Sequence, residues 1–127
     1  MIVLDASAVL AVLGGERGAS EVVERSAGGI VSTVNLAEVL QKAAHNGVAA
    51  HTVNTLIGQA EWGVVPFDDQ MALAAADLWL LTKHKGLSLG DRSCLALAQA
   101  VSGVALTLDT GWAGLEIEGA SIHIVQR

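Results

Sequence analysis

Residues 1–5, with the sequence MIVLD, open the chain with a short apolar run that ends at Asp5. A run of this length is typical of a buried strand. A second apolar run, over residues 103–108, also stops directly before an aspartate, Asp109. Ligands of an open parallel sheet bind beyond the carboxyl ends of its strands. Asp5 and Asp109 should therefore converge if these two strands are neighbours.

Alternating strand and helix signals fill the rest of the chain. Further strands are predicted over residues 30–31, 63–67 and 120–125. Helices are predicted over residues 8–13, 21–25, 35–46, 53–60, 69–84 and 88–101, with Asp68 as a helix cap and Gly86 as a helix end. Strands separated by helices indicate an α/β fold. We expect a single domain over residues 1–127, with a central parallel five-stranded sheet flanked by helices on both faces.

The composition restricts the classes of function. The net charge is −6 and only seven residues are Lys or Arg. This argues against a passive nucleic-acid-binding module, because phosphate contacts usually need a basic surface. Aromatic residues make up 3% of the chain, which disfavours a base-stacking platform. Neither feature argues against a nuclease whose carboxylates are masked by metal.

Cysteine content and apolar runs bear on location. Cys94 is the only cysteine, so neither an intrachain disulfide nor a zinc site of several thiolates can form. This agrees with a cytoplasmic location. The most apolar stretch, residues 71–81, is interrupted by Asp77, and no run approaches the ~18 apolar residues of a spanning helix. We expect no membrane insertion, but an apolar fraction of 52% predicts exposed apolar surface that marks a partner.

Four carboxylates carry the functional hypothesis. Asp5 and Asp109 follow strands, and Glu38 and Asp91 fall in the first turns of predicted helices. Carboxylates gathered in one crevice repel each other unless a cation lies among them. Their hard oxygens suit Mg²⁺ or Mn²⁺ rather than zinc. Such ions support phosphodiester cleavage by water, a reaction that needs no His or Cys nucleophile.

Each acid also has an ordinary explanation. Asp5 can cap the following helix, and Asp109 can serve a turn before Gly111. The spacings Asn35-x-x-Glu38 and Ser88-x-x-Asp91 both resemble capping boxes, and Asn35 is interpreted as a helix cap. The joint placement of the four acids, rather than any single one, favours a metal site.

Four motifs then resemble those of PIN domains. They are VLDASA at residues 3–8, NLAEV at 35–39, LSLGDRSCLALA at 87–98 and TLDTGW at 107–112. The third is the most specific, and the match spans nearly the whole chain. The length is similar to that of VapC-type toxins, the ribonuclease halves of bacterial toxin–antitoxin pairs. The intervening residues 51–85 are generic.

The resemblance implies a metal-dependent endoribonuclease that cleaves RNA with metal-activated water. It implies that Asp5 and Asp91 bind Mg²⁺ or Mn²⁺ most directly, while Glu38 completes the shell or positions water and Asp109 assists. Ser7 and Thr107 could support a carboxylate, although capping and strand filling explain them equally well. The implied partners are an RNA substrate, a cognate antitoxin that brings an Arg or Lys toward the acids, and a second copy in a homodimer.

Other classes fit the residues less well. A phosphatase of the haloacid dehalogenase class needs a second aspartate two residues after the first, where this chain has Ser7. A response-regulator receiver needs more acids after the first strand and a late lysine that is absent. The serious alternative is a binding module that keeps the PIN fold and sequesters a partner without cleavage. Arg92 is a candidate contact for RNA phosphate. The alternative explanation is that it is an ordinary charged residue on the surface.

Overall fold

Five short strands form one parallel sheet with the order β3-β2-β1-β4-β5. The computed structural model describes all of residues 1–127. The strands are β1 (Ile2–Leu4), β2 (Ile30–Ser32), β3 (Gly63–Val65), β4 (Val104–Thr107) and β5 (Ser121–Ile124). The α/β class and the parallel five-stranded sheet predicted from the sequence are confirmed.

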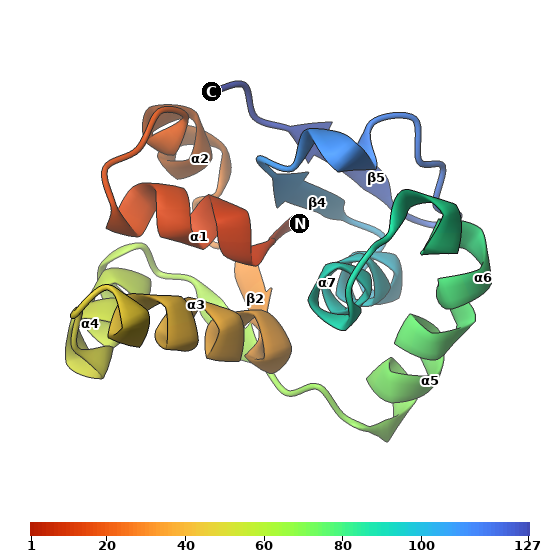
Figure 1. The fold of residues 1–127 in the computed structure, drawn as a ribbon, viewed down its shortest axis with the longest axis horizontal. Coiled ribbons are helices and arrows are strands. Elements are labelled where there is room, and N and C mark those ends of the chain that lie inside the picture. Colours follow the sequence, from red (N-terminus) through yellow and green to blue (C-terminus); the bar gives the residue numbers. More distant parts are fainter.

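Helices cover both faces of this sheet (Figure 1). One layer contains α1 (Ala6–Leu13), α2 (Ala19–Arg25), α3 (Thr33–His45) and α4 (Ala50–Gln59). The other contains α5 (Asp69–Asp77), α6 (Trp79–Thr82) and α7 (Leu89–Ala100). Leu4 and Leu106 face the first layer, whereas Val3 and Ala105 face the second. This alternation follows from the two-residue period of a strand, and it makes the central strands apolar on both sides.

The two strands that end in aspartates are neighbours at the centre of the sheet. β1 pairs with β4 so that Ile2 lies opposite Val104 and Leu4 opposite Leu106. The backbone N–H of Asp5 continues this ladder and donates to the Leu106 carbonyl at 2.9 Å. Because β2 lies on one side of β1 and β4 on the other, the chain order reverses here. Asp5 therefore lies at the position where open parallel sheets bind ligands.

The helix that carries Glu38 begins earlier than predicted. Ser32 is the N-cap of α3, and its Oγ accepts a hydrogen bond from the Val34 N–H at 3.2 Å. The interpretation of Asn35 as the cap is therefore wrong, since Asn35 lies inside the helix and is buried. Ser32 ends a buried strand directly before the helix, so its hydroxyl takes the capping position first.

The long helix predicted up to residue 84 is interrupted. Asp68 is its N-cap as expected, and accepts from the Met71 N–H at 2.9 Å. However, α5 ends at Asp77, α6 covers one turn, and a 3₁₀ turn over Lys83–Lys85 ends at Gly86, whose φ is 67°. The Thr82 hydroxyl donates to the Leu78 carbonyl at 2.8 Å. Such back-bonding by threonine can bend a helix, and here it lies in the single turn that follows the break.

Apolar side chains remain exposed along α5 and α6. Leu73, Leu80 and Leu81 are 59–67% exposed, and Trp79 is 49% exposed. Thr82, Leu78 and Ala75 of the same segment point inward and are buried. The segment is thus apolar on two sides, although only one contacts the core. No helix in the structure combines the length and apolar character needed to cross a membrane.

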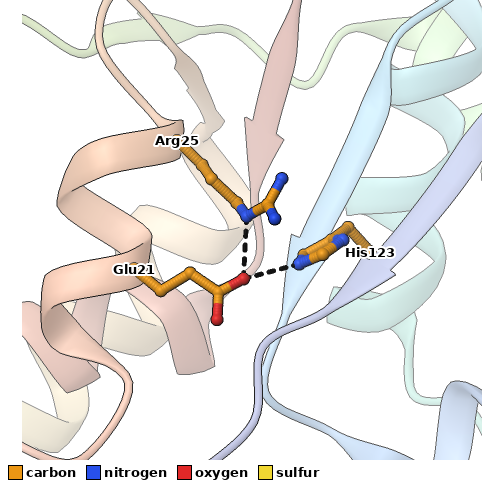
Figure 2. Close-up of polar contacts among 3 residues, drawn as sticks. All are labelled: Glu21, Arg25 and His123. Atoms are coloured by element: carbon orange, nitrogen blue, oxygen red, sulfur yellow. Dashed lines mark hydrogen bonds and ion pairs between the residues drawn. The ribbon is translucent and has the colours of Figure 1, made fainter.

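A polar contact joins α2 to β5, the strand at one edge of the sheet (Figure 2). One carboxylate oxygen of Glu21 lies 2.7 Å from Arg25 Nε and 2.7 Å from His123 Nε2, which projects from β5. The hydrogen bond to His123, followed by that to Arg25, lowers the pKa of Glu21. This cluster joins residues from opposite ends of the chain across the first helical layer.

Candidate functional site

Asp5 follows β1 directly and is held by two hydroxyl groups. Its residue is 4% exposed. Oδ2 accepts hydrogen bonds from Ser7 Oγ and Thr107 Oγ1, each at 2.8 Å. Asp5 stands at the N-cap position of α1, yet its side chain makes no capping hydrogen bond. The capping explanation for Asp5 is therefore wrong, and its Oδ1 lies outside both hydroxyl contacts.

Ser7 and Thr107 bind Asp5 in a fixed orientation. The Leu108 N–H donates to Ser7 Oγ at 3.0 Å, and the Asp109 N–H donates to Thr107 Oγ1 at 3.0 Å. Each hydroxyl has a single proton, and each uses it to donate a hydrogen bond to Asp5 Oδ2. The 3.2 Å separation of the two hydroxyl oxygens is then a contact rather than a further hydrogen bond. Thr107 is fully buried at the end of β4, so it does more here than fill the strand.

Burial makes Asp5 an unusual carboxylate. Loss of hydration raises its pKa from 3.8 to about 6, although hydrogen bonds from Ser7 and Thr107 act in the opposite direction. The negative charge of Asp91 contributes to this rise in pKa. A carboxylate this close to neutral pH holds its charge with difficulty, and a nearby cation would relieve that cost.

Asp91 lies in the first turn of α7, where it caps the helix and also acts on Asp5 through its charge. Its Oδ2 accepts from the Ser88 N–H at 2.9 Å while its own N–H donates to Ser88 Oγ at 3.1 Å. This is a complete capping box, as the spacing predicts. The same carboxylate is close enough to Asp5 to affect its pKa. Capping and a place in the acidic site are therefore compatible.

Glu38 approaches the same region from α3. Its residue is exposed, but its Oε1 accepts from the Asn35 amide at 2.8 Å. The carboxylate also lies against Gly90, directly before Asp91, so closely that a side chain at Gly90 would overlap it. The capping box expected from Asn35-x-x-Glu38 is absent, since Ser32 caps α3.

Cys94 lies near enough to three of the acids for their charges to affect its thiol. Burial, followed by the charges of Asp5, Asp91 and Glu38, raises the pKa of its thiol well above the usual value. The thiol lies one turn after Asp91 and is 3.9 Å from the Val3 carbonyl. A free cysteine in such surroundings stays a protonated thiol, so it offers no nucleophile.

Asp109 lies at the same edge, directly before the 3₁₀ turn over Thr110–Trp112. It is exposed, and its Oδ1 accepts from the Gly111 N–H at 2.8 Å, where a 3₁₀ turn begins. Its link to the site runs through Thr107, which contacts both aspartates. The ordinary turn explanation accounts for its present contacts.

The oxygen atoms of the three gathered acids suit a hard cation. No group of three His, Cys, Asp or Glu side chains stands ready-made as a metal site. However, the hydrogen bonds described above fix one oxygen in each carboxylate, namely Asp5 Oδ2, Glu38 Oε1 and Asp91 Oδ2. The second oxygen of each lies outside those bonds. A carboxylate that binds metal through one oxygen is usually held in place by a hydrogen bond to the other. Because all three side chains offer hard carboxylate oxygens, the residues fit Mg²⁺ or Mn²⁺.

Residues beside the site have structural tasks. Arg92 Nη1 donates to the Ala75 carbonyl at 2.9 Å, which joins α7 to α5 and uses one of the N–H donors of Arg92. Trp112, next to the 3₁₀ turn of Asp109, is 1% exposed and packs in the second core. Two features were not predicted from the sequence: the bridging amide of Asn35 and the close approach at Gly90. A glycine in the first turn of a helix was the available signal, because alanine is the better helix former.

Known proteins place this geometry in a family. The model of the PIN domain family matches residues 2–117. No curated protein sequence matches the chain.

Solved structures agree in fold. A chain of VapBC bound to DNA from Salmonella typhimurium matches with a TM-score of 0.74 and 16% identity, over 97% of this chain and 96% of that one. A toxin–antitoxin complex from Klebsiella pneumoniae gives 0.71 and 20% identity, over 94% and 95%. VapBC-5 from Mycobacterium tuberculosis, of the VapBC toxin–antitoxin family, gives 0.61 and 26% identity, over 98% and 97%. Since the family match covers most of the residues and the fold agrees, the chain belongs to the PIN domain family.

Proposed function

We propose that this protein is a metal-dependent endoribonuclease and the toxin of a toxin–antitoxin pair. The observation that carries the proposal is Asp5, a buried carboxylate with a pKa raised to about 6, next to the charge of Asp91. A buried carboxylate with a strongly raised pKa, at the strand ends of an open parallel sheet, is typical of a functional site. The PIN domain match and the likeness to toxin–antitoxin complexes support the same function.

Each acid has a proposed task. Asp5 and Asp91 hold the ion, Glu38 completes the set or orients the attacking water, and Asp109 assists from the rim. When bound, Mg²⁺ or Mn²⁺ lowers the pKa of water and neutralises charge on the phosphate. Ser7 and Thr107 keep Asp5 in position through Oδ2.

Cleavage of RNA with and without EDTA tests the proposal. The parent should cleave single-stranded or loop RNA in Mg²⁺ or Mn²⁺ and stop in EDTA, whereas Asp5→Asn and Asp91→Asn should be inactive. Glu118→Gln is the matched control, because Glu118 precedes β5 and so lies toward the opposite edge of the sheet. Equal cleavage by all variants would favour the alternative, a PIN-fold binding module that sequesters a partner.

The proposed antitoxin has a groove available beside the acids. A hollow of about 530 Å³ lies between α1 and the end of α3, lined by apolar residues such as Leu10 and Leu13 and also by Ser7 and Lys42. Ser7 also lines a smaller hollow next to Asp109. An antitoxin segment lying along this groove would bring an Arg or Lys toward Asp5, where its charge replaces that of the metal.

We also propose a homodimer through α5 and α6, in the cytoplasm. The exposed side chains of Leu73, Trp79, Leu80 and Leu81 supply the apolar contact. The segment is acidic at its start, with Asp68 and Asp69, and basic at its end, over Lys83–Lys85. Antiparallel packing against a second copy pairs these opposite charges, whereas parallel packing would oppose like charges. The buried free thiol of Cys94 agrees with the location.

A further inference from the structure

Asn35 is a buried amide between the helices that carry two of the acids. Its residue is 0% exposed, and its Nδ2 donates to Glu38 Oε1 at 2.8 Å and to the Gly90 carbonyl at 3.0 Å. One amide group therefore joins α3 to the first turn of α7. Glu38 is exposed as a residue, so solvent alone would satisfy its carboxylate. The hydrogen bond from Asn35 is therefore not needed to satisfy the carboxylate, and its effect is to fix the direction in which the carboxylate points.

The orientation of the Asn35 amide comes at a cost. Its Oδ1 is buried and has no hydrogen-bond partner. Turning the amide over would bring this oxygen toward both the Glu38 carboxylate and the Gly90 carbonyl, which repel it. Buried polar atoms without partners are uncommon and call for an explanation. Holding Glu38 and Gly90 at the same time supplies one.

Gly90 completes the arrangement from the other side. A Cβ atom built there would overlap both carboxylate oxygens of Glu38, because the carboxylate lies directly against the backbone of α7. Gly90 is buried, and alanine would be more favourable in a helix. The glycine thus gives up helix stability and makes room for Glu38 beside Asp91.

We propose that Asn35 is a positioning residue that, together with Gly90, clamps the Glu38 carboxylate beside Asp91 so that it can contribute to binding a divalent cation. This inference rests on the proposed function. It assigns to Asn35 an effect on the metal that acts only through Glu38. A residue that merely supported α3 would change stability regardless of what stands at position 38.

A double-mutant cycle on the full chain tests the clamp, with calorimetric titration of Mn²⁺ as the measurement. Asn35→Ala should weaken Mn²⁺ binding about tenfold, as loss of an outer-shell partner does. In the Glu38→Ala background the same change should alter the affinity by less than about twofold. Val39→Ala is the structural control, since Val39 is buried in the core next to Glu38. It should lower the melting temperature and leave Mn²⁺ affinity unchanged.

Gly90→Ala provides a second route if Asn35→Ala does not fold. The added methyl group displaces the carboxylate, and the flexible Glu38 side chain can swing away, so Mn²⁺ affinity should fall with little change in melting temperature. In the Glu38→Ala background Gly90→Ala should leave the affinity unchanged. Equal weakening in both backgrounds, or none in either, overturns the clamp alone. A parent chain that binds no Mn²⁺ overturns the proposed function and the clamp with it.

Discussion

At Asp5, charge and burial are in conflict, and this conflict has a consequence for stability. The pKa is about 6 in the folded chain against 3.8 for an ordinary aspartate. Above pH 6 the native state therefore carries a penalty of about 3 kcal/mol, which disappears as the pH falls from 6 toward 3.8. Asp5→Asn should raise the free energy of unfolding by up to about 3 kcal/mol at pH 7–8 in EDTA. It should abolish metal binding at the same time.

Urea unfolding at a series of pH values measures this effect. The advantage of Asp5→Asn over the parent should shrink between pH 6 and pH 4, because the parent then gains a proton in the native state. Asp77→Asn is the control, since Asp77 is exposed on α5. A variant that is less stable than the parent at pH 8 would contradict the burial penalty and revive a purely structural role.

Thr107 should set the pH at which Asp5 becomes charged. Its hydroxyl donates to Asp5 Oδ2 and lowers the pKa of that carboxyl. Thr107→Val keeps the shape and removes the donor, so the pKa of Asp5 should rise above 6 and Mn²⁺ binding should begin at a higher pH. The change also leaves the Asp109 N–H without its acceptor, at a cost of about 1–3 kcal/mol.

Mn²⁺ titrations from pH 5 to pH 8 check the shift. Thr107→Ser should behave as the parent does, because it retains the hydroxyl. The same pH midpoint in Thr107→Val and the parent would show that the hydrogen bond does not tune Asp5.

Residue types and spacing were enough to select the acids as candidate metal ligands, but they did not predict the hydrogen bonds that hold those acids. Asp5, Glu38 and Asp91 come together because strand ends and helix starts of a parallel sheet share one edge. The partners of Asp5 could not be predicted with the same certainty, since Thr107 is 102 residues away. Asn35 was assigned to a cap because its bridge to Gly90 depends on how α3 packs on α7.

At the scale of elements, α7 combines a cap and a candidate ligand, and these roles can be separated. Ser88→Ala removes the hydroxyl that accepts from the Asp91 N–H, which should cost about 0.5–2 kcal/mol. The Ser88 N–H still anchors Asp91 Oδ2, so Mn²⁺ affinity should be preserved. Asp91→Asn should do the opposite, because asparagine can still accept from the Ser88 N–H but carries no charge.

Thermal unfolding and Mn²⁺ titration of the two variants, side by side, make the comparison. If Ser88→Ala weakens metal binding as much as Asp91→Asn does, the cap itself orients the site. If Asp91→Asn keeps full affinity, capping is the whole role of Asp91.

Element types were predicted more reliably than element ends. Short apolar runs bounded by glycines and acids identified all five strands. For the central strands the reason is that burial on both faces leaves few polar positions. Helix starts shifted where a residue outside the apolar pattern took the cap, as Ser32 does in α3. The break after Asp77 falls inside a continuous run of good helix formers, so propensity and periodicity do not reveal it.

For the whole molecule, metal should raise the melting temperature. An ion that binds only the folded chain stabilises it by mass action, by about 2.7 kcal/mol at a free concentration 100 times the dissociation constant. Thermal melts in millimolar Mn²⁺ against EDTA measure this. The increase should vanish in Asp5→Asn, and an equal increase in that variant would place the ion elsewhere.

Association should depend on the outer side of α5 and α6. Leu80 is 67% exposed, so Leu80→Glu should leave the monomer folded but separate the two copies. Light scattering across a range of concentrations gives the mass, with Val23→Glu on α2 as a control that is also exposed. A parent that is monomeric at every concentration, or a Leu80→Glu dimer, would rule out this interface.

The pairing of β1 with β4 has a further consequence during synthesis. Asp5 is synthesised 102 residues before Thr107, the residue at the end of β4 whose hydroxyl holds it. Contacts this distant in sequence form late and slowly. A nascent chain therefore cannot fix Asp5 until β4 has been synthesised, so the proposed ribonuclease site does not exist before then.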